Sequence, residues 1–192
     1  MQALSDGNAK KMIKKLGFAE LEAERRERAG REKENPPAMT ALLDDIRSLH
    51  NVGAIFRTAD GAQFGHLYLC GITGTPPRNE IRKTSLGAEE NVPWSFHPDP
   101  VELAGRLQAE GYQIVVLEQT DASTDFSSAA YRFPLCLIIG HEYTGVRDEL
   151  VAMADLAIDI PMGGCKHSLN VSVAFGIAAY EISRRRDDIR RG

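Results

Sequence analysis

The 192-residue sequence lacks the features that mark membrane and secreted proteins. No apolar run approaches the ~20 residues that a membrane-spanning helix needs. The N-terminal segment carries Lys10, Lys11, Lys14 and Lys15 but no apolar stretch of the kind found in a secretory signal. We therefore expect a cytoplasmic protein.

Cysteine is scarce as well, and its three positions, Cys70, Cys136 and Cys165, are far apart. An odd number of widely spaced cysteines forms no complete disulfide framework, and two of the three lie in or beside apolar runs. The pattern predicts reduced, buried thiols and no metal site. Cys165 lies in a glycine-rich stretch, but no pattern of histidine and acid accompanies it to favour a nucleophile.

The common nucleotide and metal motifs are also missing. The sequence contains no G-x-G-x-x-G, no G-x-x-x-x-G-K, no H-E-x-x-H and no C-x-x-C. This argues against dinucleotide-dependent, phosphoryl-transfer and zinc chemistry.

The formal net charge of −4 is unevenly distributed. Residues 1–36 carry nine Lys or Arg and seven Asp or Glu, residues 184–192 carry five and two, and residues 37–183 carry nine and eighteen. The basic charge therefore lies at the two ends of the chain. Such ends can contact phosphates, although a solvated helical surface explains mixed charge runs equally well.

Short apolar runs alternate with helical patterns through most of the chain. The predicted strands are residues 39–43, 66–70, 94–97, 113–117, 135–139 and 157–160. Two of them, 113–117 and 135–139, are continuous apolar runs typical of strands buried on both faces of a parallel sheet. Predicted helices begin near residues 52, 81, 100, 145 and 169, and residues 118–133 are predicted to be a loop.

This order predicts an α/β domain over residues 37–192, with a mostly parallel sheet and helices on both faces. Residues 1–36 are predicted to form a charged helical extension, helical between Asn8 and Lys33 and closed by Pro36-Pro37.

Ligands of open parallel sheets bind at the carboxyl ends of the strands. Polar or glycine-bearing loops follow Leu117, Ile139 and Ile160, so we expect the site there. The third loop leads through Ser168-Leu169-Asn170 into the last helix, where backbone N–H groups and side-chain oxygens are presented together. Two interpretations are open: a binding site for an electron-rich group, or Ser168 acting simply as the helix N-cap.

Three segments resemble, in order and spacing, the motifs of the SpoU (TrmH-like) RNA 2′-O-ribose methyltransferases of the SPOUT superfamily. They are residues 51–59 with Phe64-Gly65, residues 138–146, and Ile160-Pro161-Met162 through residues 168–174. Residues 85–89 are similar to a further family feature. Three motifs in this order are specific, whereas any one alone would not be.

The resemblance implies a C-terminal trefoil knot, in which strands and loops after Leu135 thread to form a pocket for S-adenosylmethionine. Knots are nearly absent from other folds, so composition alone never suggests one. The resemblance also implies a homodimer with a site at or near the interface. Residues of motif one (51–59) of one subunit contribute to this site, together with residues of motif two (138–146) and motif three (160–162 and 168–174). The apolar, small-residue helix after Asn170 suits that packing.

The resemblance assigns roles to ten residues. The backbone around five is expected to hold the cofactor: Leu117, Gly140, Ile160, Met162 and Leu169. Five side chains are expected to be catalytic: Asn51, Arg57, Glu142, Ser168 and Asn170. Because a guanidinium has a pKa above about 12, we expect Arg57 to clamp the phosphate and stabilise the developing alkoxide, while the phosphate or water takes the proton. Asn51 would orient the hydroxyl.

The sequence departs from the family pattern at His141, where the family usually has Asn before the Glu. A neutral imidazole donates one hydrogen bond and accepts another, so cofactor binding can survive. Either the substitution is tolerated or it changes a substrate contact and adds a pH sensitivity. An activity profile that His141→Asn leaves unchanged from about pH 5.5 to about 8 would exclude the second interpretation.

The favoured hypothesis is S-adenosylmethionine-dependent 2′-O-methylation of tRNA or rRNA, with residues 1–36 and 184–191 contacting the RNA. The alternative is a noncatalytic, dimeric RNA-binding paralogue of the same fold. The presence of Arg57, Glu142, Ser168 and Asn170 argues against it. Methylation of a base nitrogen lacks support, because motif one with its arginine belongs to the ribose-modifying branch.

Overall fold

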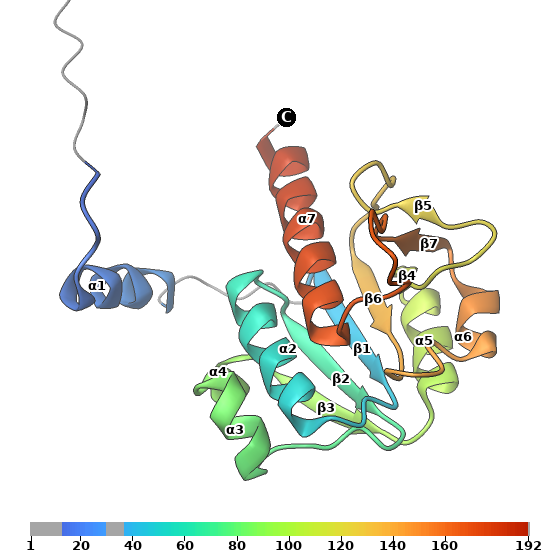
Figure 1. Ribbon diagram of the computed structural model, residues 1–192, viewed down its shortest axis with the longest axis horizontal. Coiled ribbons are helices and arrows are strands. Elements are labelled where there is room, and N and C mark those ends of the chain that lie inside the picture. Colours follow the sequence, from blue (N-terminus) through green and yellow to red (C-terminus); the bar gives the residue numbers. More distant parts are fainter. Residues whose placement is uncertain (1–12, 30–36, 192) are drawn as a thin grey trace, which may run out of the picture. The chain divides into compact units, whose positions relative to one another are not determined.

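The computed structural model describes residues 13–29 and 37–191 (Figure 1). The chain divides into two units, residues 1–33 and 34–192, and each is described by itself. The first unit contains α1 (Phe18–Ala29). The carboxylate of Glu20 accepts a hydrogen bond from the Gly17 N–H at the start of this helix, where an acid is favoured. Both ends of the longer helical stretch predicted from Asn8 to Lys33 lie outside the described residues.

The second unit is built on a seven-stranded sheet in which, within residues 37–191, all neighbouring strands are parallel. The strand order is β3-β2-β1-β6-β4-β7-β5. The strands are β1 (Met39–Asp44), β2 (His66–Cys70), β3 (Trp94–His97), β4 (Gln113–Leu117), β5 (Thr124–Asp125), β6 (Leu135–Ile139) and β7 (Leu156–Asp159). The prediction of an α/β domain with a parallel sheet is confirmed.

The middle of the sheet consists of the most apolar strands. β6 pairs with β1 on one side and with β4 on the other, and Leu137 is opposite both Ala41 and Val115. All residues of β1 and β6 are buried. The continuous apolar runs therefore occupy the positions that are covered on both faces, as predicted.

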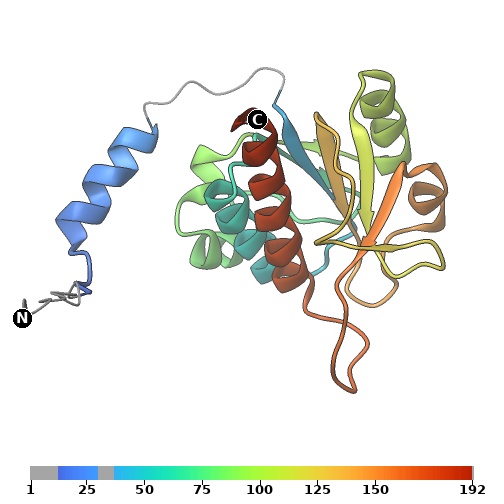
Figure 2. The same cartoon turned by 90° about the horizontal axis from the view of Figure 1, so that it is seen from above.

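Helices cover both faces of the sheet, and Figure 2 shows the two layers on either side of it. One layer contains α2 (Leu49–Gly61), α3 (Asn79–Ser85), α4 (Ala88–Asn91) and α7 (Val171–Arg191), and the other contains α5 (Pro100–Ala109) and α6 (Asp148–Met153). Phe56 of α2 and Phe175 of α7 belong to the first core cluster. Leu103 of α5 and Leu150 of α6 belong to the second. Both clusters consist of buried side chains, so each face of the sheet has its own apolar layer.

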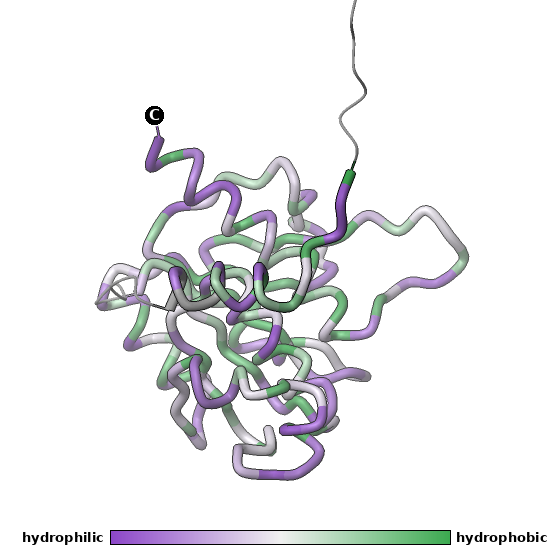
Figure 3. Tube along the Cα trace, turned by 90° about the vertical axis from the view of Figure 1, so that its left-hand side faces the viewer, coloured by the Kyte–Doolittle hydropathy of each residue, from purple (hydrophilic) through white to green (hydrophobic). Residues whose placement is uncertain are grey.

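The hydropathy along the chain matches this burial. Figure 3 shows hydrophobic segments in the interior of the second unit and a mostly hydrophilic C-terminal end of α7. Among the described residues, no helix combines the length and apolar character needed to cross a membrane. Cys70 and Cys136 are buried free thiols, as predicted, whereas Cys165 is exposed. Burial raises the pKa of the Cys136 thiol to about 12, so this thiol stays protonated and inert.

Two short elements differ from the predictions because too few residues carry a pattern. β5 lies within residues 118–133, which were predicted to be a loop, and two residues cannot show a periodicity. A single helix beginning near residue 81 was predicted where α3 and α4 lie. Leu86 (φ 52°) and Gly87 (φ 90°) separate these two helices, since both have left-handed backbone conformations that a helix cannot contain.

The last two helices also begin later than predicted. α6 was predicted from residue 145, but Gly145 has φ 73°, and the helix begins at Asp148. α7 was predicted over 169–186 and instead spans Val171–Arg191. Ion pairs three and four residues apart, such as those from Arg184 to Glu181 and Asp188, stabilise its polar last turns.

Candidate active site

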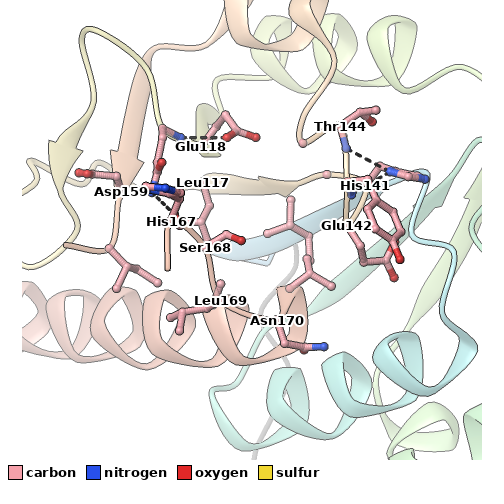
Figure 4. A pocket seen from close by; sticks show the side chains of 18 of the residues that line it. Leu117, Glu118, His141, Glu142, Thr144, Asp159, His167, Ser168, Leu169 and Asn170 are labelled. Atoms are coloured by element: carbon pink, nitrogen blue, oxygen red, sulfur yellow. Dashed lines mark hydrogen bonds between the residues drawn. The ribbon is translucent and has the colours of Figure 1, made fainter. Parts of the chain in front are cut away.

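A cavity of about 350 Å³ lies at the carboxyl ends of β4, β6 and β7 (Figure 4). It is lined by the three loops that follow these strands and by the first turn of α7. The lining residues are 117–119, 139–145, 159, 160, 162, 167–171 and 174. The three loops expected to form the site therefore meet around one space.

The loop after β6 is a tight turn held by its own first residue. His141 and Gly145 exchange two backbone hydrogen bonds of 3.0 and 2.9 Å. The imidazole Nδ1 of His141 accepts the backbone N–H groups of Tyr143 (3.1 Å) and Thr144 (3.3 Å). The Oδ1 atom of an Asn at this position would offer an acceptor to the same donors, which favours the interpretation of His141 as a tolerated substitution.

Glu118, which directly follows β4, holds the other end of this turn. Its carboxylate accepts hydrogen bonds from the N–H groups of Val146 (2.9 Å) and Gln119 (3.0 Å). The backbones also approach closely, because a Cβ added at Gly140 would lie 2.3 Å from the backbone of Gly145. Gly140 and Gly145 are therefore required by space and, at Gly145, by the positive φ.

Glu142 points away from its own turn toward the start of α2. Its carboxylate accepts hydrogen bonds of 3.0 Å from the N–H groups of Arg47 and Ser48 and from Nδ2 of Asn51. Burial raises the pKa of this carboxyl, but these hydrogen bonds outweigh burial and hold the pKa below its ordinary value of 4.5. Glu142 is therefore an ionised anchor, with both carboxylate oxygens engaged by N–H donors.

Asn51 connects this anchor to the third loop. Its Oδ1 accepts a hydrogen bond of 3.1 Å from Nδ2 of Asn170. Asn170 Oδ1 in turn accepts hydrogen bonds from the N–H (2.9 Å) and hydroxyl (2.6 Å) of Ser172. Asn170, not Ser168, is thus the residue whose side chain caps α7. Of the two interpretations left open, that of Ser168 as the helix N-cap is wrong, because the helix begins two residues later than expected.

A partly buried ion pair lies beside the cavity loops. Nε of Arg147 lies 2.9 and 3.0 Å from the two carboxylate oxygens of Asp44, and Nη2 lies 2.8 Å from Asp45 Oδ2. Asp44 ends β1 and is buried, whereas Arg147 follows the β6 turn. The pair therefore fixes the turn to the central strand, a geometry for which the arginine fork is suited.

Carboxylates dominate the charge of the cavity. Glu118, Glu142 and Asp159 line it, and no Lys or Arg of the described residues does. Asp159 differs from the other two because its carboxylate makes no hydrogen bond or ion pair with the described residues. A cavity of this charge suits a ligand with a positive centre.

Comparison with known proteins decides the family. A model of the SpoU rRNA Methylase family matches residues 38–180, which include all three loops of the cavity. The chain belongs to the SpoU family.

Relatives of this SpoU protein are similar over most of the second unit. The tRNA (guanosine(18)-2′-O)-methyltransferase of Thermus thermophilus is 35% identical over 150 residues, which are 78% of this chain and 76% of the relative. The chain spans between 66% and 76% of the lengths of the Escherichia coli and Thermus methyltransferases with this name.

Solved structures share the fold. The crystal structure of the Aquifex aeolicus TrmH/SpoU tRNA modifying enzyme has a TM-score of 0.75 and 31% identity, and the match covers 88% of this chain and 86% of that one. The AdoMet-bound rRNA methyltransferase of Sinorhizobium meliloti has a TM-score of 0.71 and 30% identity, with 78% and 56% covered.

Most of the residues to which the sequence assigned a role lie together in this SpoU site. The residues expected to hold a cofactor, all of which line the cavity, are Leu117, Gly140, Ile160, Met162 and Leu169. Glu142, Ser168 and Asn170 also line it, and Asn51 reaches it through its hydrogen bonds. Arg57 does not: its side chain is exposed on α2 and makes no hydrogen bond or ion pair with the described residues.

Sequence reasoning missed Glu118, Asp44 and Arg147. Glu118 carried a usable signal, because an acid directly after a buried parallel strand lies at the ligand-binding edge of the sheet. Asp44 and Arg147 are 103 residues apart and carried none, since an ion pair over that separation leaves no local pattern.

Proposed function

We propose that this SpoU protein transfers the methyl group of S-adenosylmethionine to a ribose 2′-hydroxyl of tRNA or rRNA. The chain of hydrogen bonds from Glu142 through Asn51 to Asn170 carries the proposal, because it joins the three motifs around one cavity. The names of the Thermus relative and of the AdoMet-bound S. meliloti structure support the reaction and the cofactor.

The cavity fits S-adenosylmethionine in size and charge. Its volume of about 350 Å³ is within the usual range for small-molecule sites, and its carboxylates favour a cationic ligand. The backbones of Leu117, Gly140 and Ile160 at the strand ends, with Met162 and Leu169 opposite, would hold the cofactor. When bound, the cofactor supplies an electrophilic methyl group on a sulfonium.

Glu142 acts as a positioning residue in this proposal. N–H donors of residues 47, 48 and 51 stabilise its ionised carboxylate and lower its pKa, so it is unsuited to take the proton of the attacking hydroxyl. It fixes Asn51, and Asn51 and Asn170 then present amide groups that orient the ribose. Ser168 completes the polar wall.

Arg57 requires a second subunit in this proposal. The residue is exposed and lies outside the cavity of its own chain. We infer a homodimer that brings Arg57 of one subunit to the cavity of the other, where the guanidinium clamps the phosphate and stabilises the developing alkoxide. The phosphate or water takes the proton, because a neutral guanidine is too costly.

Three further features complete the proposal. The segment after Leu135 forms the trefoil knot of the superfamily, which is compatible with β6 lying between β1 and β4. Residues 1–36 are a separate charged extension that contacts the RNA, and residues 37–192 are the catalytic domain. The protein acts in the cytoplasm, where tRNA and rRNA are modified.

The test combines cofactor binding with detection of the product. Isothermal titration should show binding of S-adenosylmethionine, and mass spectrometry should show one 2′-O-methylated nucleotide that is absent from RNA of a deletion strain and restored by the purified protein. Cofactor binding without any restored nucleotide would exclude the activity. Absence of cofactor binding would favour the noncatalytic paralogue.

The role of Arg57 is tested by Arg57→Lys. We expect turnover to fall about 100-fold, because the lysine retains the charge but loses the two-pronged geometry. The exposed Arg132→Lys variant is the matched control and should keep full turnover. Near-normal turnover of Arg57→Lys with normal RNA binding would contradict the proposed clamp.

A further inference from the structure

We propose that Tyr143 is a stacking platform for a base of the RNA substrate and so a substrate-binding residue. The inference rests on the proposed function and goes beyond it, because no motif role was assigned to this residue. It identifies the contact as one with the face of an unpaired base.

The first observation is exposure at the site. The Tyr143 side chain is 85% exposed although it lines the cavity. Most tyrosines bury much of their ring, because the ring contributes a large apolar area. Among the described residues that line the cavity, the only other rings are the imidazoles of His141 and His167.

The second observation is that the ring is carried by a rigid turn. The N–H of Tyr143 is bound by Nδ1 of His141, and the preceding Glu142 is anchored on the first residues of α2. The two backbone hydrogen bonds between His141 and Gly145 close the turn on the other side. The ring centroid lies 5.9 Å from that of His141 at an interplanar angle of 48°. The backbone under the ring is therefore set before the substrate arrives, which lowers the entropy cost of binding.

The third observation concerns charge and decides between base and phosphate. The cavity wall that one chain supplies contains carboxylates and, among the described residues, no Lys or Arg, so it offers the phosphate no cation apart from the proposed Arg57 of the second subunit. An aromatic face stacks on any base without needing charge, and proteins that recognise unpaired RNA use such stacking. A 2′-hydroxyl that reaches the cavity brings its own or a neighbouring base to the mouth, where Tyr143 lies.

The experiment compares Tyr143→Ala with Tyr143→Phe, using unmodified total RNA from a deletion strain as substrate. We expect Tyr143→Ala to raise the KM for RNA at least about fivefold, the size of one lost stacking contact, with little change in kcat. Tyr143→Phe should remain near the wild type, because the ring is kept. The Kd for S-adenosylmethionine should be unchanged in both.

Phe96→Ala is the matched control, since Phe96 is an exposed ring on β3 outside the cavity. It should leave the KM for RNA unchanged.

Four outcomes would overturn the inference. An unchanged KM in Tyr143→Ala, with an active wild type, removes the stacking role and leaves the proposed function intact. A KM raised equally in Tyr143→Phe assigns the contact to the hydroxyl. Dissociation of Tyr143→Ala into monomers in light scattering assigns the ring to a protein interface. A wild type that methylates no RNA removes the proposed function and this inference together.

Discussion

Asp159 ends β7 with a carboxylate on the cavity wall that no described residue neutralises. Glu118 and Glu142 differ, because backbone N–H groups share their negative charge. Asp159 is half-buried, so solvent screens part of its field but not all of it. Its charge is therefore the one that should distinguish a sulfonium from a neutral thioether.

We expect Asp159→Asn to weaken S-adenosylmethionine binding about threefold to tenfold, while S-adenosylhomocysteine, which lacks the positive sulfur, changes less than about twofold. Isothermal titration of both ligands against the variant and the wild type measures the change in each Kd. Asp121→Asn, an exposed carboxylate outside the cavity, is the control and should leave both affinities unchanged. Equal weakening of both ligands would instead indicate a hydrogen bond to a group that they share.

Residue identity in the site was more predictable than residue role. Motif resemblance selected Glu142 and Asn51, but it did not reveal that Glu142 accepts the N–H groups of Arg47 and Ser48. Those partners are 94 and 95 residues away, and backbone donors leave no trace in a sequence. The interpretation of Ser168 as a cap, one of the two left open, failed for a related reason, since the helix start is fixed by the side-chain geometry of Asn170.

At the scale of elements, the edge strand β3 and its neighbour β2 carry a polar cluster outside the cavity. Nε2 of His66 and Nε2 of His97 each lie 2.9 Å from the hydroxyl of Ser95. Burial, followed by the proximity of His97, lowers the pKa of His66. Burial, followed by Arg106, lowers the pKa of His97. Both imidazoles are therefore held neutral in the folded protein.

This cluster predicts an acid-sensitive sheet edge. Because both folded-state pKa values lie below the ordinary 6.5, the unfolded chain binds more protons in this range. The free energy of unfolding should fall as the pH decreases from about 6.5 toward the lowered pKa values. Urea denaturation between about pH 7.5 and about 5 measures this effect. The free energy of unfolding of the His66→Gln/His97→Gln variant should depend less steeply on pH than that of the wild type.

The exposed His167→Gln variant controls for the loss of a histidine as such and should keep the wild-type slope. If the double variant also keeps that slope, the acid sensitivity arises from groups other than this cluster.

Elements were predictable where many residues share one pattern. The strands at 113–117 and 135–139 were identified because every residue is apolar or lies within an apolar run, and both are central in the sheet. β5 was not, because its two residues are held by pairing with β7 and not by their own preference. Leu86, which has a left-handed backbone conformation, likewise separates α3 from α4, but a leucine gives no turn signal in a sequence.

At the scale of the whole molecule, the basic C-terminal end is less available than its composition suggested. Arg184 and Arg185 form ion pairs with Glu181, and Arg186 is only 5% exposed and donates to Gln63 and Asp187. Arg186 therefore cannot contact RNA as expected from its position in the basic run. The proposed RNA contact of the chain ends rests mainly on residues 1–36.

The exposed face of α7 is the surface best suited to a second subunit. Its core face is formed by Phe175, Ala178, Ala179 and Ile182, which are buried. The opposite face carries a stripe of apolar residues that, with their exposed fractions, are Val173 (51%), Ile177 (36%) and Tyr180 (57%), and Leu169 (37%) lies just before the helix. Residues spaced by four and three lie on one side of a helix, so this stripe is continuous from the cavity outward.

We expect the Val173→Asp/Ile177→Asp variant to be monomeric in light scattering, because two carboxylates in an apolar interface lose their hydration without a partner. It should lose methyl transfer, since Arg57 of the second subunit no longer reaches the cavity. It should still bind S-adenosylmethionine within about threefold of the wild type, because one chain supplies the whole described wall. Ile189→Asp, exposed at the far end of α7 and off the stripe, should remain dimeric and active. A monomer that retains full turnover would show that Arg57 serves its own cavity, and the intersubunit site would then be wrong.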